Sequence, residues 1–290
     1  MSTQDRSAIA IGANTWIWES PITDDALATL APRIRGWGFD VVELPVETPG
    51  DWYPDRTAAL LSGLGLGATV CCAMGPDRDL TGADPEVTAA TQNYLLFCVD
   101  AAATIGATVV AGPIYAPVGR TGHLGPDERE AMLGRAAAAL RPVAEHASSR
   151  GVRLGVEPLN RFETNLINTA AQVIDLVDRV DHPACGVMLD TFHMNIEEKH
   201  PAEAIRAVGP RLAHFHACGT DRGTPGTDHT DWTAIAGALR EVGYAGPVVI
   251  ESFTADNLTI ATAASIWRPL APSQDTIAVD GLAFLRRVLG

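Results

Sequence analysis

Short, continuous runs of apolar residues alternate with longer Ala-rich stretches along the whole chain. The short runs do not alternate between polar and apolar residues, so they predict strands that are buried on both faces. We predict eight of them, at 8–14, 40–45, 67–73, 107–113, 153–158, 185–190, 211–217 and 247–252. Helical patterns occupy 24–36, 55–64, 86–104, 127–149, 169–180, 201–208, 231–242 and 275–288.

This alternation of strand and helix predicts an α/β fold, a single (β/α)8 TIM barrel with extended loops at its C-terminal face. No composition break or charge block divides residues 1–290, so one domain is expected. The segment 253–275 is expected to form a loop and a short helix near the mouth. The longest other connections all follow predicted strand ends, where barrel enzymes build their sites: 73–86, 112–126, 191–200 and 217–231.

Composition narrows the function classes. The 290 residues include 35 Asp and Glu against 21 Lys and Arg, for a net charge of −14. Such an acidic chain is a poor candidate for binding nucleic acid. It has neither an apolar run of about 18 residues nor a signal-peptide pattern, so no membrane partner is expected. The five cysteines form no CxxC pair and are expected to be reduced thiols in a cytoplasmic protein.

Four predicted strands finish on residue types that bind metals. The strands are RLGVEP, CGVMLD, RLAHFHA and PVVIES, and the candidate ligands are Glu157, Asp190, His216 and Glu251, at spacings of 33, 26 and 35 residues. In a parallel barrel, consecutive strand ends converge on one face. Singly, each residue is explained as a helix cap, an ion-pair partner or a structural histidine. Together they favour a site for a hard or borderline divalent cation.

Each loop beyond these strands carries a further polar group. Glu163, His193 and Arg222 follow the candidate ligands by six, three and six residues. They are candidates for contacts with a bound substrate, although solvated loop charges are the common fate of such residues. His214 lies two positions before His216 and is a candidate to orient a ligand.

Several of these segments closely resemble the ketose 3-epimerase family. The resemblance lies in EPLNRFE, LDTFHMNIEE, HFHACGTDRGTPG, IWRPL and CCAMG, and runs from about residue 8 to the C-terminus. The family includes D-tagatose, D-psicose (D-allulose) and L-ribulose 3-epimerases, within the xylose isomerase-like barrels. The resemblance implies that the four candidate ligands hold a divalent metal ion, with Mn²⁺ first and Co²⁺ or Mg²⁺ as alternatives. It also implies that Glu163, His193 and Arg222 hold the substrate around O1 to O3.

The function expected from this resemblance is metal-dependent epimerisation of free ketoses at C3 through a cis-enediolate. Inversion requires proton removal from one face and proton return on the other. Glu157 and Glu251 follow the fifth and eighth strands, so they are the expected catalytic pair. The partners implied are a small-molecule sugar and further copies of the chain, as a homodimer or homotetramer.

Other functions fit part of this pattern. An aldose–ketose isomerase, or a lyase acting on a 3-keto sugar derivative, would use the same metal site. A zinc phosphodiesterase of the endonuclease IV kind would need more histidines and a basic face, and a non-catalytic sugar-binding protein would not need two opposed carboxylates.

The preferred ketose stays open. The chain has Ser252 where the family has proline, and we expect this and similar departures to alter the walls of the sugar pocket. Trp16, Trp18 and Ile114 are candidates to close that pocket, although each is equally well explained as part of the core. Cys71 and Cys72 are expected to serve packing rather than to act as nucleophiles, and one of them is a candidate to line the pocket.

Overall fold

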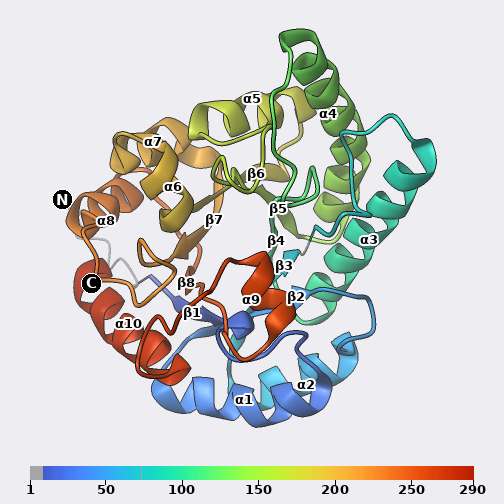
Figure 1. Ribbon diagram of the computed structural model, residues 1–290. Helices are drawn as coiled ribbons and strands as arrows, with labels where there is room; N and C mark the ends of the chain where they lie inside the picture. The colour runs from blue at the N-terminus through green and yellow to red at the C-terminus, as the bar shows by residue number, and fades with distance from the viewer. Residues whose placement is uncertain (1–8, 73) are drawn as a thin grey trace, which may run out of the picture.

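Eight parallel strands close into a barrel in the computed structural model, which describes residues 9–72 and 74–290 (Figure 1). Each strand pairs with the next, and β8 pairs with β1 to complete the ring. The strands are β1 (Ile11–Asn14), β2 (Val41–Val46), β3 (Gly67–Cys72), β4 (Val109–Gly112), β5 (Arg153–Val156), β6 (Cys185–Asp190), β7 (Leu212–Ala217) and β8 (Val248–Ile250). The predicted TIM barrel is confirmed. Residues 8 and 73, at the ends of two predicted strands, lie outside the described residues.

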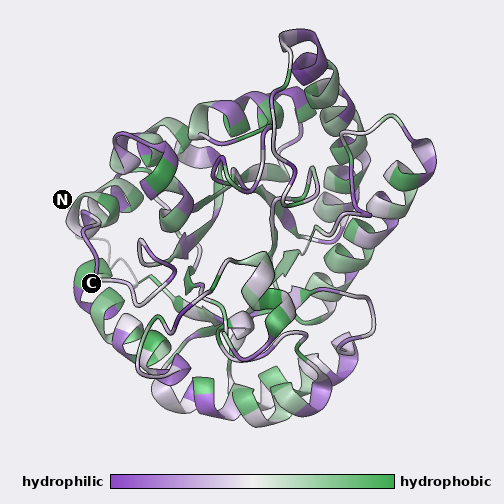
Figure 2. Cartoon of the chain, viewed as in Figure 1, coloured by the Kyte–Doolittle hydropathy of each residue, from purple (hydrophilic) through white to green (hydrophobic). Residues whose placement is uncertain are grey.

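Helices surround the barrel (Figure 1). Eight of them match predicted helices to within one residue at each end: α1 (Asp24–Trp37), α2 (Pro54–Leu64), α3 (Pro85–Thr104), α4 (Pro126–Ser149), α5 (Ala170–Val180), α7 (Pro201–Val208), α8 (Trp232–Glu241) and α10 (Gln274–Leu289). Two 3-10 turns are also present, η1 (Thr15–Ile17) and η2 (Gly209–Arg211). Figure 2 shows apolar and polar segments on these helices, as expected for elements with one side on the barrel and one in solvent.

The strands are buried as their apolar runs predict. Every residue of β2 and of β6 is buried. The observed strands β5 and β8 stop one residue before Glu157 and Glu251. Both glutamates still bond to the neighbouring strand, since the amide of Glu157 donates to Gly112 O (2.9 Å) and that of Glu251 to Ala217 O (3.4 Å). Hydrogen bonds of the barrel therefore fix the main-chain positions of Glu157 and Glu251.

Two short helices lie at the C-terminal face. The helix expected within 253–275 is confirmed as α9 (Leu258–Ala263), which crosses the mouth of the barrel in Figure 1. The connection 191–200, expected as a loop, instead contains α6 (Thr191–Glu197). Its N-cap is Asp190, whose Oδ1 accepts a hydrogen bond from the amide of Phe192 at 2.8 Å. Seven residues are too few to give a clear helical period, so the pattern did not predict it.

Among the described residues, no helix combines the length and the apolar content that a bilayer crossing requires.

Candidate active site

A cavity of about 360 Å³ opens at the C-terminal face of the barrel. That volume is within the usual range for small-molecule sites. Six of the seven residues predicted for the site line it: Glu157, Glu163, His193, His216, Arg222 and Glu251. The seventh, Asp190, is fully buried next to them. The structure therefore brings all seven predicted residues together.

The four candidate metal ligands form one cluster. Ligand atoms of Glu157, Asp190 and His216 lie within 4.8 Å of one another. Glu251 adjoins them, with its Oε1 3.3 Å from His216 Nδ1. These residues come from β5, β6, β7 and β8, so neighbouring strand ends meet as the spacing predicts.

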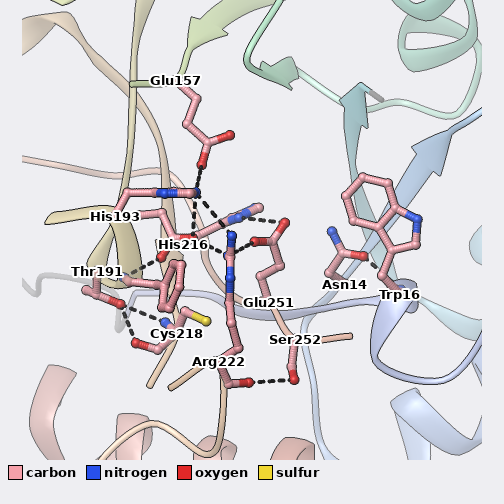
Figure 3. A network of polar contacts seen from close by, with 12 residues as sticks. Asn14, Trp16, Glu157, Thr191, His193, His216, Cys218, Arg222, Glu251 and Ser252 are labelled. Atoms are coloured by element: carbon pink, nitrogen blue, oxygen red, sulfur yellow. Dashed lines mark hydrogen bonds and ion pairs between the residues drawn. The ribbon is translucent and has the colours of Figure 1, made fainter. Parts of the chain in front are cut away.

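The guanidinium of Arg222 lies inside this cluster (Figure 3). Its Nη1 is 3.1 Å from Asp190 Oδ2 and 2.8 Å from Glu251 Oε2. It also stacks on aromatic rings, 3.9 Å from the ring centre of Phe192 and 5.0 Å from that of Phe253. A guanidinium with this many partners is held in one orientation, with its donors directed at the cluster.

The backbone of Arg222 is held as firmly as its side chain. Its φ of +67° is unusual for a residue other than glycine. The hydroxyl of Ser252 donates a hydrogen bond to the Arg222 carbonyl at 2.6 Å. Ser252 is fully buried and does not line the cavity, so the expectation that it alters the pocket wall is wrong. Its hydroxyl anchors the loop that presents the guanidinium.

Asn160, which the sequence analysis did not single out, orients the two other substrate-binding candidates. Its backbone N–H donates to His193 Nδ1 at 3.0 Å, and its side-chain Nδ2 donates to Glu163 Oε1 at 2.8 Å. Since Nδ1 accepts, the proton of a neutral His193 is on Nε2, which lies 3.7 Å from Glu157 Oε1 and 3.2 Å from Arg222 Nη2. Of these two neighbours only Glu157 can accept that proton, because the guanidinium of Arg222 is itself a donor. Burial, with Arg222 adding to it, lowers the pKa of His193 well below its usual value and keeps this donor neutral.

The carboxyl groups of the cluster have different affinities for protons. Burial raises the pKa of Glu157, and the nearby charges of Glu251 and Asp190 raise it further. Burial also opposes ionisation of Glu251, but His216 and Arg222 outweigh it and lower the pKa of Glu251. Burial raises the pKa of Asp190 to about 7, against the opposing effect of Arg222. Without a bound ion, Glu157 therefore holds a proton more readily than Glu251 does.

Comparison with known proteins places the chain in one family. Residues 32–288 match the family model of the xylose isomerase-like TIM barrel. The chain is 34% identical to a probable ketose 3-epimerase of Synechocystis, over 96% of both proteins. It is 31% identical to a ketose 3-epimerase of Arthrobacter globiformis, over 95% of both. A solved structure of L-ribulose 3-epimerase superposes with a TM-score of 0.91 at 32% identity, covering 97% of this chain and 94% of that one.

The chain belongs to the ketose 3-epimerase family. It is therefore an enzyme of the racemase and epimerase class of isomerases, and its relatives support epimerisation of ketoses at C3. The resemblance read from the sequence motifs is confirmed.

Glu43 of β2 is a buried residue of this epimerase that the sequence analysis missed. Its Oε1 lies 2.6 Å from His216 Nε2 and accepts from Asn14 Nδ2 at 3.0 Å. Its Oε2 lies 2.6 Å from His214 Nε2 and accepts from Thr69 Oγ1 at 2.9 Å. Burial opposes its charge, but the two histidines hold the pKa of Glu43 well below its usual value. A glutamate inside the apolar run DVVELP was the available signal, because a buried carboxylate requires partners.

The contact with Glu43 leaves His216 suited to a metal. Its Nε2 faces Glu43, whereas its Nδ1 is buried, makes no hydrogen bond and faces Glu251. A carboxylate bound to the far nitrogen of an imidazole is the usual support of a metal-binding histidine. Three carboxylates around the unpaired Nδ1 complete a donor set that fits a divalent cation.

The predictions for the pocket wall have mixed outcomes. Trp16, Cys71 and Cys72 line the cavity. Trp18 does not line it, but stacks on Trp37 at 5.6 Å between ring centres. Ile114 is fully buried and also lies outside the lining. Of the two alternatives for Trp18 and Ile114, packing with the core is therefore confirmed, and a place in the pocket wall is not.

Proposed function

We propose that this enzyme inverts C3 of free ketoses through a cis-enediolate, with Glu157 and Glu251 as its two proton-transfer groups. The observation that supports this most strongly is the placement of two buried carboxyls in one cluster, Glu157 beside His193 and Glu251 beside Arg222, with pKa values displaced in opposite directions (Figure 3). One carboxylate removes the C3 proton, and the other, protonated, returns a proton to the opposite face. Two groups are needed because the planar intermediate stays in place.

The remaining site residues bind and orient the sugar in this proposal. Neutral His193 and the guanidinium of Arg222 donate hydrogen bonds to O2, where negative charge develops as the C3 proton leaves. Glu163 accepts a hydrogen bond from the O1 hydroxyl. Asn160 holds His193 and Glu163 together, so both ends of the C1–C3 segment are fixed by one residue.

Glu157, Asp190, His216 and Glu251 would hold the divalent cation, for which we propose Mn²⁺ first and Co²⁺ or Mg²⁺ as alternatives. When bound, such an ion supplies Lewis-acid stabilisation of the charge on O2. We also propose a homodimer or homotetramer in the cytoplasm, which sedimentation and cell fractionation would test.

The test is proton exchange in D₂O with added Mn²⁺. A panel of fructose, psicose, tagatose, sorbose, ribulose and xylulose is expected to include a ketose that gains deuterium at C3, seen by NMR. Glu157→Gln and Glu251→Gln should each abolish formation of the C3 epimer because each lacks one proton carrier, while circular dichroism shows an intact fold. Glu128→Gln, an exposed change on α4, is the control and should retain full activity.

Three outcomes would contradict the proposal. Deuterium at C1 or C2 alone would indicate aldose–ketose isomerisation, and loss of a substituent from a 3-keto sugar would indicate a lyase. Near-native formation of the C3 epimer by either glutamine variant would reject the two-carboxyl scheme.

A further inference from the structure

Glu47 is an acidic residue of the cavity that the proposed mechanism does not use. It lies one residue beyond the end of β2 and lines the same cavity as Glu157 and Glu251. In a closed ring of eight strands, β2 is opposite β6, which carries Asp190. Glu47 is therefore placed across the mouth from the candidate metal ligands.

The carboxylate of Glu47 is held by one oxygen only. Its Oε1 accepts hydrogen bonds from Trp16 Nε1 at 2.9 Å and from Ser20 Oγ at 2.7 Å, and both donors belong to buried residues. The Glu47 main-chain oxygen accepts from Arg78 Nη2 at 2.6 Å, which fixes the backbone. Within the described residues, Oε2 has no hydrogen-bond partner. The side chain is thus oriented by two donors and keeps a free acceptor.

The rest of that side of the cavity has few polar groups. Apart from the candidate catalytic residues, the lining is mainly apolar, including Cys71, Met74, Val118, Phe253 and Ile260. A sugar hydroxyl buried against such a wall loses its hydrogen bonds to water, which is costly unless an acceptor replaces them. Among the described lining residues, Glu47 is the only carboxylate besides the candidate site residues.

We propose that Glu47 determines specificity by accepting a hydrogen bond from a hydroxyl on the C4–C6 part of the ketose. This rests on the proposed function, which places C1–C3 at the catalytic carboxyls and so directs the other end of the sugar across the cavity. A carboxylate there selects a neutral polyhydroxy chain and repels a phosphate or carboxylate at the end of the sugar. The substrate class is the unphosphorylated ketose.

The test pairs a change in the enzyme with a change in the sugar. For the ketohexose that reacts best, kcat/KM is measured beside its 4-deoxy, 5-deoxy and 6-deoxy analogues. Glu47→Ala should lower kcat/KM on the order of tenfold for the parent, the usual effect of losing a charge-assisted hydrogen bond. For one analogue, the one that lacks the bound hydroxyl, that loss should disappear. Equal loss for all four sugars, or no loss for the parent, would overturn the proposal.

Matched variants separate the contact from other effects. Glu19→Ala removes a nearby exposed carboxylate that does not line the cavity. It should leave the ratios of kcat/KM between the parent ketose and its analogues unchanged. Ser20→Ala removes one of the two donors to Oε1 and should cause a smaller loss with the same pattern among the sugars. Glu47→Gln removes the charge and should reduce the preference for the free ketose over its 6-phosphate. An unchanged preference would reject selection by charge.

Calorimetry keeps this inference distinct from the proposed reaction. Binding of the same four sugars to the Mn²⁺-loaded protein is measured for wild type and Glu47→Ala. Affinity that depends on Glu47 in the predicted pattern, without deuterium exchange at C3, would reject the reaction and retain the contact. Exchange at C3 with no such pattern in affinity or kcat/KM would reject the contact and retain the reaction.

Discussion

Single residues in this barrel have roles that depend on which atom faces which neighbour. Glu43 illustrates this, because its two oxygens face His214 and His216 and also accept from Asn14 and Thr69. Each oxygen thus has two neighbours, one histidine and one neutral donor. The part of the carboxylate is to hold the His216 ring so that Nδ1 is directed at the other candidate ligands. Glu43 is therefore a positioning residue.

Replacing Glu43 should weaken metal binding although the residue is not a ligand. Glu43→Gln keeps the size of the side chain but offers only one acceptor oxygen, so one histidine loses its partner. We expect the Kd for Mn²⁺ to rise about 10- to 100-fold, the usual effect of losing such support. Calorimetry or electron paramagnetic resonance of free Mn²⁺ measures this. Thr69→Val, which removes one hydrogen bond and keeps the carboxylate, should have a much smaller effect, and an unchanged Kd in Glu43→Gln would contradict the assignment.

At the scale of elements, the short helix α6 connects stability with the site. Asp190 caps the helix through Oδ1, while its Oδ2 contacts Arg222. Asp190 is therefore both a helix cap and a candidate site residue. The two oxygens divide the tasks, and substitutions can separate them.

Asp190→Asn and Asp190→Ala should differ in stability but agree in metal binding. Asparagine still caps a helix, whereas alanine loses the cap and about 1 kcal/mol of unfolding free energy. Both remove the charge, so both should bind Mn²⁺ far more weakly.

The difference in unfolding free energy between wild type and Asp190→Asn should depend on pH. Since burial raises the pKa of Asp190 to about 7, its ionisation destabilises the metal-free fold as pH rises through that value. The asparagine variant should therefore be at least as stable as wild type at pH 8 without metal. Urea unfolding in EDTA measures these differences, and equal stability of the two variants would show that the cap contributes nothing.

At the scale of the molecule, closure of the barrel brings the site together. The candidate ligands come from four consecutive strands, and the supporting Glu43 comes from β2 across the interior. The unfolded chain has no such arrangement, since Glu43 and His216 are 173 positions apart. A cation that binds this cluster therefore binds only the folded barrel.

Metal binding should stabilise the whole domain. At a free Mn²⁺ concentration of about 100 times Kd, the added unfolding free energy is about 2.7 kcal/mol, which corresponds to a rise in Tm of several degrees. Differential scanning calorimetry in Mn²⁺ and in EDTA measures it. Asp190→Asn is the control and should show almost no rise. Identical transitions for wild type in both buffers would show that the cluster does not bind the ion.

The sequence by itself determined the barrel and the seven candidate site residues. Strands that are buried on both faces have continuous apolar runs in the sequence. Because all eight strands are parallel, the residue that ends each run lies at the C-terminal face of the barrel. The family motifs around Glu157, Asp190 and His216 added their expected roles. Local pattern was sufficient because each of these positions is fixed within its own strand and loop.

Only the tertiary structure decided which groups meet. The pairing of Glu43 with both histidines, the Asn160 bridge, the insertion of Arg222 between two carboxylates and the placement of Glu47 across the cavity depend on side chains from distant strands. Ring closure sets those distances, and a linear sequence does not contain them. Burial within the closed ring raises the pKa of Glu157, whereas His216 and Arg222 outweigh burial and lower the pKa of Glu251, which no pattern of residue types along the chain encodes.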